Sequence, residues 1–170
     1  VSITSASPTG SGTGSHTAVT VAQFASEGPT FNYGGVSNLL DNESVGEKVF
    51  FGTGQTVKGK LYYLNTSGAW ALADTDAEAS TAALIAVACG GDGSGSANDA
   101  ATHGMLIRGF IDNASYLTGT YDEGIPVYVD GTAGNMTITR PTSGFVRVIG
   151  WCCATANVIY FNPDNTYLEL

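Results

Sequence analysis

An internal repeat is the feature of this sequence that most constrains its fold. Residues 59–64 (GKLYYL) align without a gap on residues 124–129 (GIPVYV), with Gly at the first position and Tyr at the fifth. Further along, residues 84–89 align on 147–152, and a third apolar segment follows in each copy, at 105–108 and 158–161. A three-strand unit is too small to bury its own apolar face, so the two copies are predicted to pack around one core. Two unrelated hairpins with glycine turns would also look alike, and this alternative stays open.

From residue 46 onward the chain consists of short apolar segments separated by turn residues, at a spacing of about ten residues that is typical of a sandwich or small barrel. The predicted strands are Glu47–Phe51, Lys60–Leu64, Ala69–Ala73, Ala83–Cys89, Met105–Ile111, Ile125–Val129, Met136–Thr139, Phe145–Cys152 and Val158–Phe161. The Ala-rich stretch 74–83 has no 3.6-residue apolar face, which favours a loop or a single turn. The predicted fold is all-β, a small β-barrel or sandwich built from two three-strand repeats, with an extended N-terminal arm.

Composition divides the chain into an N-terminal arm and connector, residues 1–45, and a β body, residues 46–170. Within the body, repeat one spans about residues 54–111 and repeat two about 119–161. The first 16 residues are rich in Ser, Thr and Gly, which cannot build a core, so this segment is predicted to be extended. The apolar residues that such an arm offers a partner are Val1, Ile3, Val19, Val21 and Phe24.

The charge balance excludes several partners. Six Lys and Arg residues against fifteen Asp and Glu residues give a formal net charge of -9. Binding to nucleic acid depends on basic side chains that neutralise phosphates, so no nucleic-acid partner is expected, and an anionic membrane is disfavoured for the same reason. No apolar run approaches the roughly 18 residues of a membrane-spanning helix, and the first residues lack the order of a signal peptide, so we expect a soluble chain.

The sequence offers little for catalysis. His16 and His103 lack a second ligand at metal-binding spacing, and no serine lies in a G-x-S-x-G motif. The glycine runs at 10–14 and 90–95 lack the Lys of a phosphate-binding loop and are predicted to be flexible, with residues 90–104 protruding from the body. We therefore predict no enzyme activity, no catalytic residues, no metal and no cofactor.

Acidic clusters leave one alternative open. Asp74, Asp76 and Glu78, or Asp92 with Asp99, could present oxygens to one Ca²⁺ ion. Neither set matches the twelve-residue loop that calcium-binding helices use. Solvated loop acids are the favoured interpretation.

Cys89, Cys152 and Cys153 are odd in number and lack zinc or redox spacing, so we predict small buried, reduced thiols. A vicinal disulfide between Cys152 and Cys153 stays open as the alternative.

The aromatic residues fall into two groups. Those on or beside apolar strands are predicted to lie in the core: Tyr63, Trp70, Tyr128 and Trp151. Tyr116 and Tyr121, like Tyr167, lie in turn-rich polar segments, a composition shared by protein interfaces and sugar-stacking sites. Tyr116 and Tyr121 are therefore predicted as surface-recognition residues.

The stretches FVRVIGWC (145–152) and VIYFNPDNTYLEL (158–170) are the most specific part of the β body. Through them, residues 46–170 resemble the small β-domains of bacteriophage virion surface proteins, which include capsid decoration or cement proteins, head fibres and tail fibres. The resemblance implies a structural role on the virion surface and a homotrimer, and it carries over no catalytic residues.

Two functions follow as expectations. The first is a capsid decoration protein that binds the major capsid protein lattice through its arm and stabilises the exterior of the shell. The second is a fibre domain that binds a host-surface glycan or receptor. We favour decoration because the sequence has neither a heptad run nor a periodic β-stalk.

Overall fold

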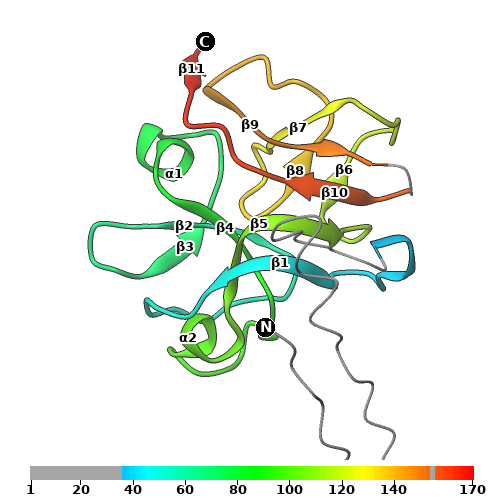
Figure 1. Ribbon diagram of the computed structural model, residues 1–170. Helices are drawn as coiled ribbons and strands as arrows, with labels where there is room; N and C mark the ends of the chain where they lie inside the picture. Colours follow the sequence, from blue (N-terminus) through cyan, green and yellow to red (C-terminus); the bar gives the residue numbers. More distant parts are fainter. Residues whose placement is uncertain (1–35, 154–155) are drawn as a thin grey trace, which may run out of the picture. The chain divides into compact units, whose positions relative to one another are not determined.

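The computed structural model describes residues 36–153 and 156–170 (Figure 1), so the predicted arm residues Val1, Ile3, Val19, Val21 and Phe24 lie outside the described residues. The described part is all-β, with two five-residue helices and one short 3-10 helix, η2 (Val36–Asn38). The strands up to the middle of the chain are β1 (Ser44–Val49), β2 (Leu61–Leu64), β3 (Trp70–Leu72), β4 (Ile85–Ala88) and β5 (Met105–Asp112). The others are β6 (Leu117–Thr118), β7 (Pro126–Val129), β8 (Met136–Thr137), β9 (Phe145–Cys152), β10 (Val158–Phe161) and β11 (Tyr167–Glu169).

The same pairing order occurs twice along the chain. In the first segment β2 pairs with β3 and β4, and β4 pairs with β5; in the second, β7 pairs with β8 and β9, and β9 pairs with β10, all antiparallel. The register also corresponds, because Tyr63 lies opposite Ile85 and Tyr128 lies opposite Val148. Each segment thus forms a four-stranded unit rather than the predicted three-stranded one.

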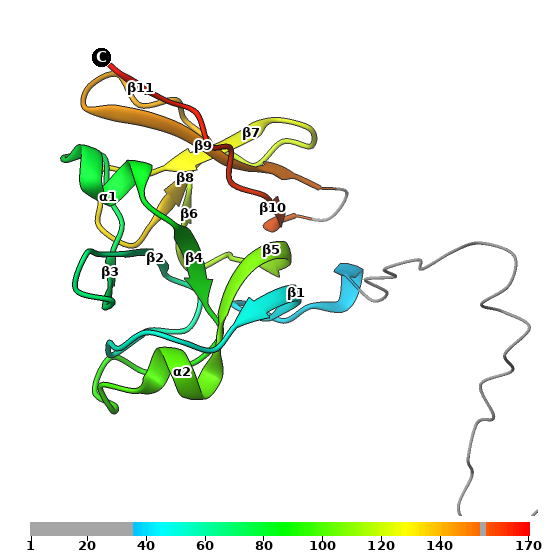
Figure 2. The same ribbon diagram turned by 60° about the vertical axis from the view of Figure 1, so that its left-hand side comes forward.

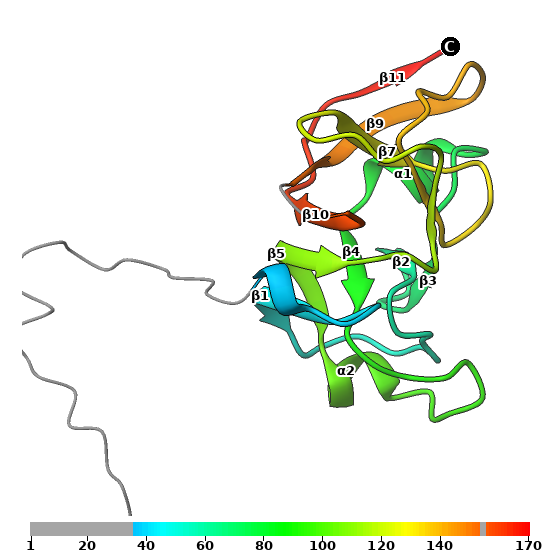
Figure 3. The ribbon, with the colours of Figure 1, turned by 90° about the vertical axis from the view of Figure 1, so that its right-hand side faces the viewer.

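Pairing of β5 with β10 joins the two units into one continuous sheet. The sheet runs in the order β3-β2-β4-β5-β10-β9-β7-β8-β6, with β1 added to β5 and β11 added to β9. Figures 2 and 3 show the sheet curling, with the strands of the first unit on one side of the β5–β10 seam and those of the second on the other. Curling brings the apolar faces of both units together.

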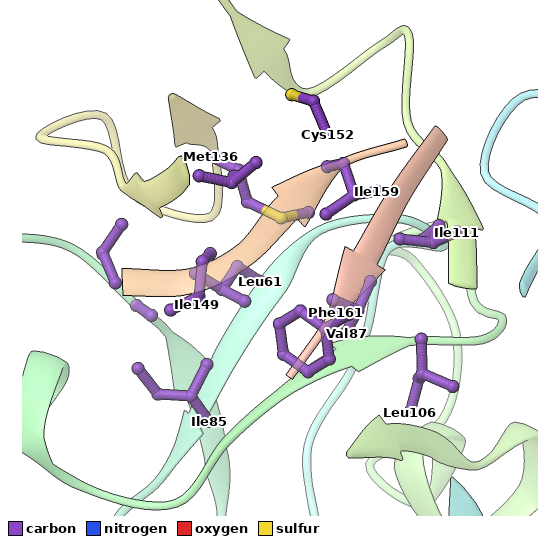
Figure 4. Packing of buried hydrophobic residues seen from close by; sticks show 13 residues of the cluster. Leu61, Ile85, Val87, Leu106, Ile111, Met136, Ile149, Cys152, Ile159 and Phe161 are labelled. Carbon is purple, nitrogen blue, oxygen red and sulfur yellow. The ribbon is translucent and has the colours of Figure 1, made fainter. Parts of the chain in front are cut away.

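The main core draws on both units. Its buried side chains are Leu61, Ala73, Ile85, Val87, Leu106 and Ile111 from the first and Val127, Val129, Met136, Ile149, Cys152, Ile159 and Phe161 from the second. Figure 4 shows Phe161, on β10, lying among side chains of β4 and β5. Each unit therefore supplies the apolar surface that the other lacks.

A smaller second core lies on the opposite face of β2 and β4. All four residues of β4 are buried, because Ile85 and Val87 face the main core while Ala86 and Ala88 face the second one. The small alanine side chains leave room for the segment that follows β4 to fold back over this face. Ala100, in helix α2 (Asp99–His103), is fully buried there.

This arrangement corrects part of the prediction that residues 90–104 protrude as a loop, because residues 99–103 form α2 and are packed on the body, whereas residues 92–98 are exposed. Asp99 is buried, and its carboxylate accepts hydrogen bonds from the backbone N–H groups of Thr56 (3.3 Å) and Ser96 (3.1 Å). It is therefore a structural acid and not a solvated one, whereas Asp92 is exposed as predicted. The sequence pattern missed α2 because a single turn is too short to show periodicity.

Every predicted strand overlaps an observed one, and the all-β prediction is confirmed. β1 begins three residues before the predicted start, at Ser44, because the strand continues along β5 through the close pair Gly46 and Gly109. A side chain at Gly46 would lie 2.2 Å from the Arg108 carbonyl oxygen, so glycine is required at this crossing.

The helix α1 (Glu78–Ala82) is the single turn expected in the Ala-rich stretch. The prediction missed β6, which has two residues, and β11, whose residues are all exposed.

Replacing Phe161 by Ala tests the shared core. Because this fully buried ring packs against both units, we expect F161A to lower the free energy of unfolding by about 3–5 kcal/mol. Phe50, which is 60% exposed, provides the matched control, and F50A should cost about 1 kcal/mol or less. Urea unfolding measures both values. Equal losses for the two variants would contradict a core that spans the units.

Candidate binding surface

A buried arginine organises the surface around the C-terminal strands. Arg147, on β9, is only 5% exposed. Its Nε donates to the Asp164 carbonyl oxygen (2.6 Å), and its Nη1 donates to the carbonyl oxygens of Thr81 (2.6 Å) and Ala83 (2.7 Å) at the end of α1. One guanidinium thus ties two loops to β9. Burial lowers the pKa of Arg147 and the nearby Asp164 raises it, and the group stays charged at neutral pH.

Residues 162–166 (NPDNT), which connect β10 to β11, form the clamped loop. Backbone N–H groups of Asn162 and Asp164 donate to the carbonyl oxygens of Ile149 (2.9 Å) and Val148 (3.0 Å). The Asp164 carboxylate accepts from the Thr166 N–H (2.9 Å), which holds the pKa of Asp164 below its ordinary value. The loop therefore has a defined conformation and presents an ionised carboxylate.

Beside this loop, Trp151 lies on the outer face of β9. It is 46% exposed, which corrects the prediction that it is a core residue. Its neighbour Cys152 faces the main core, and strand alternation directs Trp151 outward.

Trp70 is buried as predicted, Tyr63 packs against the main core, and Tyr128 is half-buried. Apolar character alone could not tell the two tryptophans apart.

An open hollow of about 360 Å³ has Trp151 as part of its wall. The other lining residues are Val148, Asn162, Pro163, Asp164 and Asn165. A second hollow of about 240 Å³ also borders Pro163, and its lining includes Leu84, Ile107 and Arg108. The clamped loop therefore lies between the two hollows, and its residues Asn162, Pro163 and Asn165 line both of them. The larger hollow adds the Trp151 ring and Asp164, whereas the smaller one adds aliphatic side chains, two arginines and Glu47.

The predicted recognition residues Tyr116 and Tyr121 are half-buried rather than exposed. The Tyr121 ring packs against the main core, and its hydroxyl donates to the carbonyl oxygens of Cys153 and Val158. The Tyr116 ring lies under the ammonium group of Lys60, 5.3 Å from its Nζ. Polar neighbours in the sequence did not reveal that both rings have partners within the body.

At the far end of β9, the exposed strand β11 carries a group of apolar side chains. Leu168 and Leu170 are each about half exposed, and Tyr167 is 37% exposed. The Tyr167 hydroxyl donates to the Glu78 carboxylate in α1, which raises the pKa of Tyr167. Among the described strands, β11 pairs with β9 alone. Its second edge thus has backbone groups that no described strand satisfies.

The acidic residues considered for calcium have other partners. The Asp74 carboxylate accepts from the Asp76 N–H (3.1 Å) and the Ser80 hydroxyl (2.7 Å), a local turn that leads into α1. Within residues 36–153 and 156–170, no group of three or more His, Cys, Asp or Glu side chains lies together as metal ligands would. His103 lies at the end of α2, and His16 is outside the described residues.

Comparison with known proteins found no matching family model, no matching curated protein and no matching solved structure. None of the helices in the described part of the chain has the length and apolar character needed to cross a bilayer.

The three cysteines are free thiols, and we expect Cys152 to be unreactive in the folded protein. Burial raises the pKa of Cys152 to about 11, so at pH 8 about one molecule in a thousand has the reactive thiolate. Alkylation at pH 8 followed by peptide mass mapping should leave Cys152 unmodified in native protein and modify all three cysteines in urea. Rapid native labelling of Cys152 would contradict this prediction.

Replacing Arg147 by Met tests whether its guanidinium holds the clamped loop in place. Because three carbonyl oxygens lose their charged donor, we expect R147M to lower the free energy of unfolding by about 2–4 kcal/mol and to make residues 162–166 more sensitive to protease. R140M alters an exposed arginine and is the matched control. A native-like protease pattern in R147M would show that the loop does not depend on Arg147.

Proposed function

We propose that this protein is a non-enzymatic bacteriophage virion protein that decorates the outer surface of the capsid and stabilises the shell. The observation that carries the proposal is the edge of β11, where exposed apolar side chains accompany backbone groups without a partner among the described strands. Open sheet edges pair readily with strands of other chains, and β11 leaves Tyr167 and Leu168 exposed beside a single charged residue, Glu169. A strand of a major capsid protein suits this edge, since strand addition satisfies the backbone groups and buries Leu168.

The composition of the N-terminal segment supports the same function. The core described above is built from residues between Leu61 and Phe161, so the body holds together around its own side chains. A Ser-, Thr- and Gly-rich arm with apolar residues at Val19, Val21 and Phe24 can then serve a partner instead. Binding through an arm and an edge adds many weak contacts that are gained and lost together.

Attachment to a closed shell also explains why a long arm is tolerable. Ordering an extended segment costs about 1–2 kcal/mol per residue, and this cost is met once when the protein binds an immobile lattice. The resemblance to virion β-domains supports a homotrimer as the assembled form, which would place several arms on one capsid site. Light scattering of the purified protein measures that state directly.

Deleting residues 1–24 and changing Leu168 to Lys test the proposal with purified capsids that lack this protein. We expect both variants to stay folded, with melting temperatures within a few degrees of the wild type, because the buried apolar residues of the described core lie between Leu61 and Phe161. Capsid binding measured by co-sedimentation should be lost on deletion and reduced at least about tenfold in L168K, since a charge opposes burial of the edge. E169K places the same lysine side chain beside Leu168, at a position that is already charged, and leaves the apolar side chain of Leu168 in place, so it is the matched control.

Full binding by both variants would contradict capsid decoration through these two elements. If the protein instead binds host cells and not capsids, the fibre function is the correct one. That result would be seen directly as sedimentation with cells and absence from the shell.

A further inference from the structure

We propose that the hollow beside Trp151 binds a neutral saccharide, in addition to the capsid contacts made elsewhere on the chain. Its lining combines one exposed indole with two amides and one carboxylate, all on β9 and the clamped 162–166 loop. The volume, about 360 Å³, lies within the roughly 300–1,000 Å³ of small-ligand sites.

The indole provides the apolar platform. A pyranose ring has a face of C–H groups that packs on an aromatic ring, while its hydroxyl groups point outward from its edge. Trp151 is 46% exposed on the outer face, directly opposite Tyr160 on the neighbouring strand. Paired residues on adjacent strands project to the same face, so Tyr160 extends the aromatic surface across β10.

The loop provides the polar groups that sugar hydroxyls require. Among the described residues, no hydrogen bond engages the side-chain amides of Asn162 and Asn165, and each amide offers two donors and an acceptor. The Asp164 carboxylate, kept ionised by the Thr166 N–H, accepts from hydroxyl groups. This carboxylate and the net charge of -9 disfavour an anionic sugar.

The site is also held in place before a ligand arrives. The Arg147 Nε donates a hydrogen bond of 2.6 Å to the Asp164 carbonyl oxygen, and backbone hydrogen bonds attach the loop to β9 at Ile149 and Val148. A ligand then binds without the cost of ordering the loop. The Trp151 ring is also accessible to a ligand, whereas the rings of Tyr116 and Tyr121 already contact other residues of the body.

A protein partner is the main competing occupant, since tryptophan is also common at protein interfaces. The lining argues against it, because polar groups of one loop surround a single ring, whereas the exposed leucines, Leu168 on β11 and Leu170 directly after it, lie outside this hollow. The exposed leucines, which suit a protein partner, and the hollow beside Trp151, which suits a saccharide, thus lie on different parts of the surface.

The test is calorimetric titration of the full chain with maltohexaose, cellohexaose, N-acetylchitohexaose and mannohexaose. We expect saturable binding of at least one of these, weakened about tenfold or more by W151A and measurably by N165A. F50A removes an aromatic ring that is more exposed than Trp151 and lies outside the hollow, so this variant should bind like the wild type. Because Trp70 is buried and the chain has two tryptophans, the fluorescence of the wild type reports mainly on Trp151 as the sugar binds.

Two outcomes overturn the proposal. One is the absence of saturable binding by all four sugars, and the other is binding that W151A and N165A leave unchanged. Loss of capsid sedimentation in W151A without any sugar binding would identify the hollow as a protein interface. Because the capsid test uses changes in residues 1–24 and Leu168, its failure and the failure of the sugar site are distinguishable.

Discussion

The buried guanidinium of Arg147 is the interaction on which the candidate binding surface of this protein depends. A charged group this deep in a protein is costly unless hydrogen bonds compensate for its lost water, and here three backbone carbonyl oxygens do so. Two of these lie at the end of α1, where carbonyl groups lack partners within the helix. The third belongs to the loop between β10 and β11. One side chain therefore satisfies a helix end and positions a loop at the same time.

This clamp also links the two four-stranded units. Helix α1 belongs to the first unit in the sequence, yet it is attached to β9 of the second through Arg147, and the Phe145 N–H donates to the Thr75 carbonyl oxygen (2.9 Å) nearby. In return, the Leu61 N–H of the first unit donates to the Gly134 carbonyl oxygen of the second (2.9 Å). Together with the shared core, these exchanges make the body one cooperative structure.

Function then follows from what the rigid body leaves exposed. The β5–β10 seam and both cores are filled by side chains, so the two binding surfaces proposed for the described body lie at its periphery: the open edge of β11, and the hollow between Trp151 and the clamped loop. These regions differ in chemistry, with aliphatic side chains at the edge and an aromatic ring with amides in the hollow. We infer that they serve different partners, a protein lattice at the first and a saccharide at the second.

The sequence by itself determined the strands and their repetition. Alternating apolar residues, regularly spaced turn residues and the match between residues 59–64 and 124–129 are local features, and they predicted an all-β body with nine of its strands in place. Local patterns could not show which face of a strand points inward. Trp151 and Trp70 have similar neighbours, yet only the pairing of β9 with β10 and β7 directs Trp151 outward.

Tertiary structure alone decided the long-range contacts that hold the loops of the body in place. Arg147 meets Thr81 across 66 residues of sequence, Tyr121 reaches the Val158 carbonyl oxygen across 37, and Asp99 is buried against Thr56 across 43. Hydrogen bonds over such separations depend on how the sheet curls, because curvature sets which loops come within bonding distance. A sequence specifies the residues that can form these contacts, and the three-dimensional closure of the two units selects the ones that do.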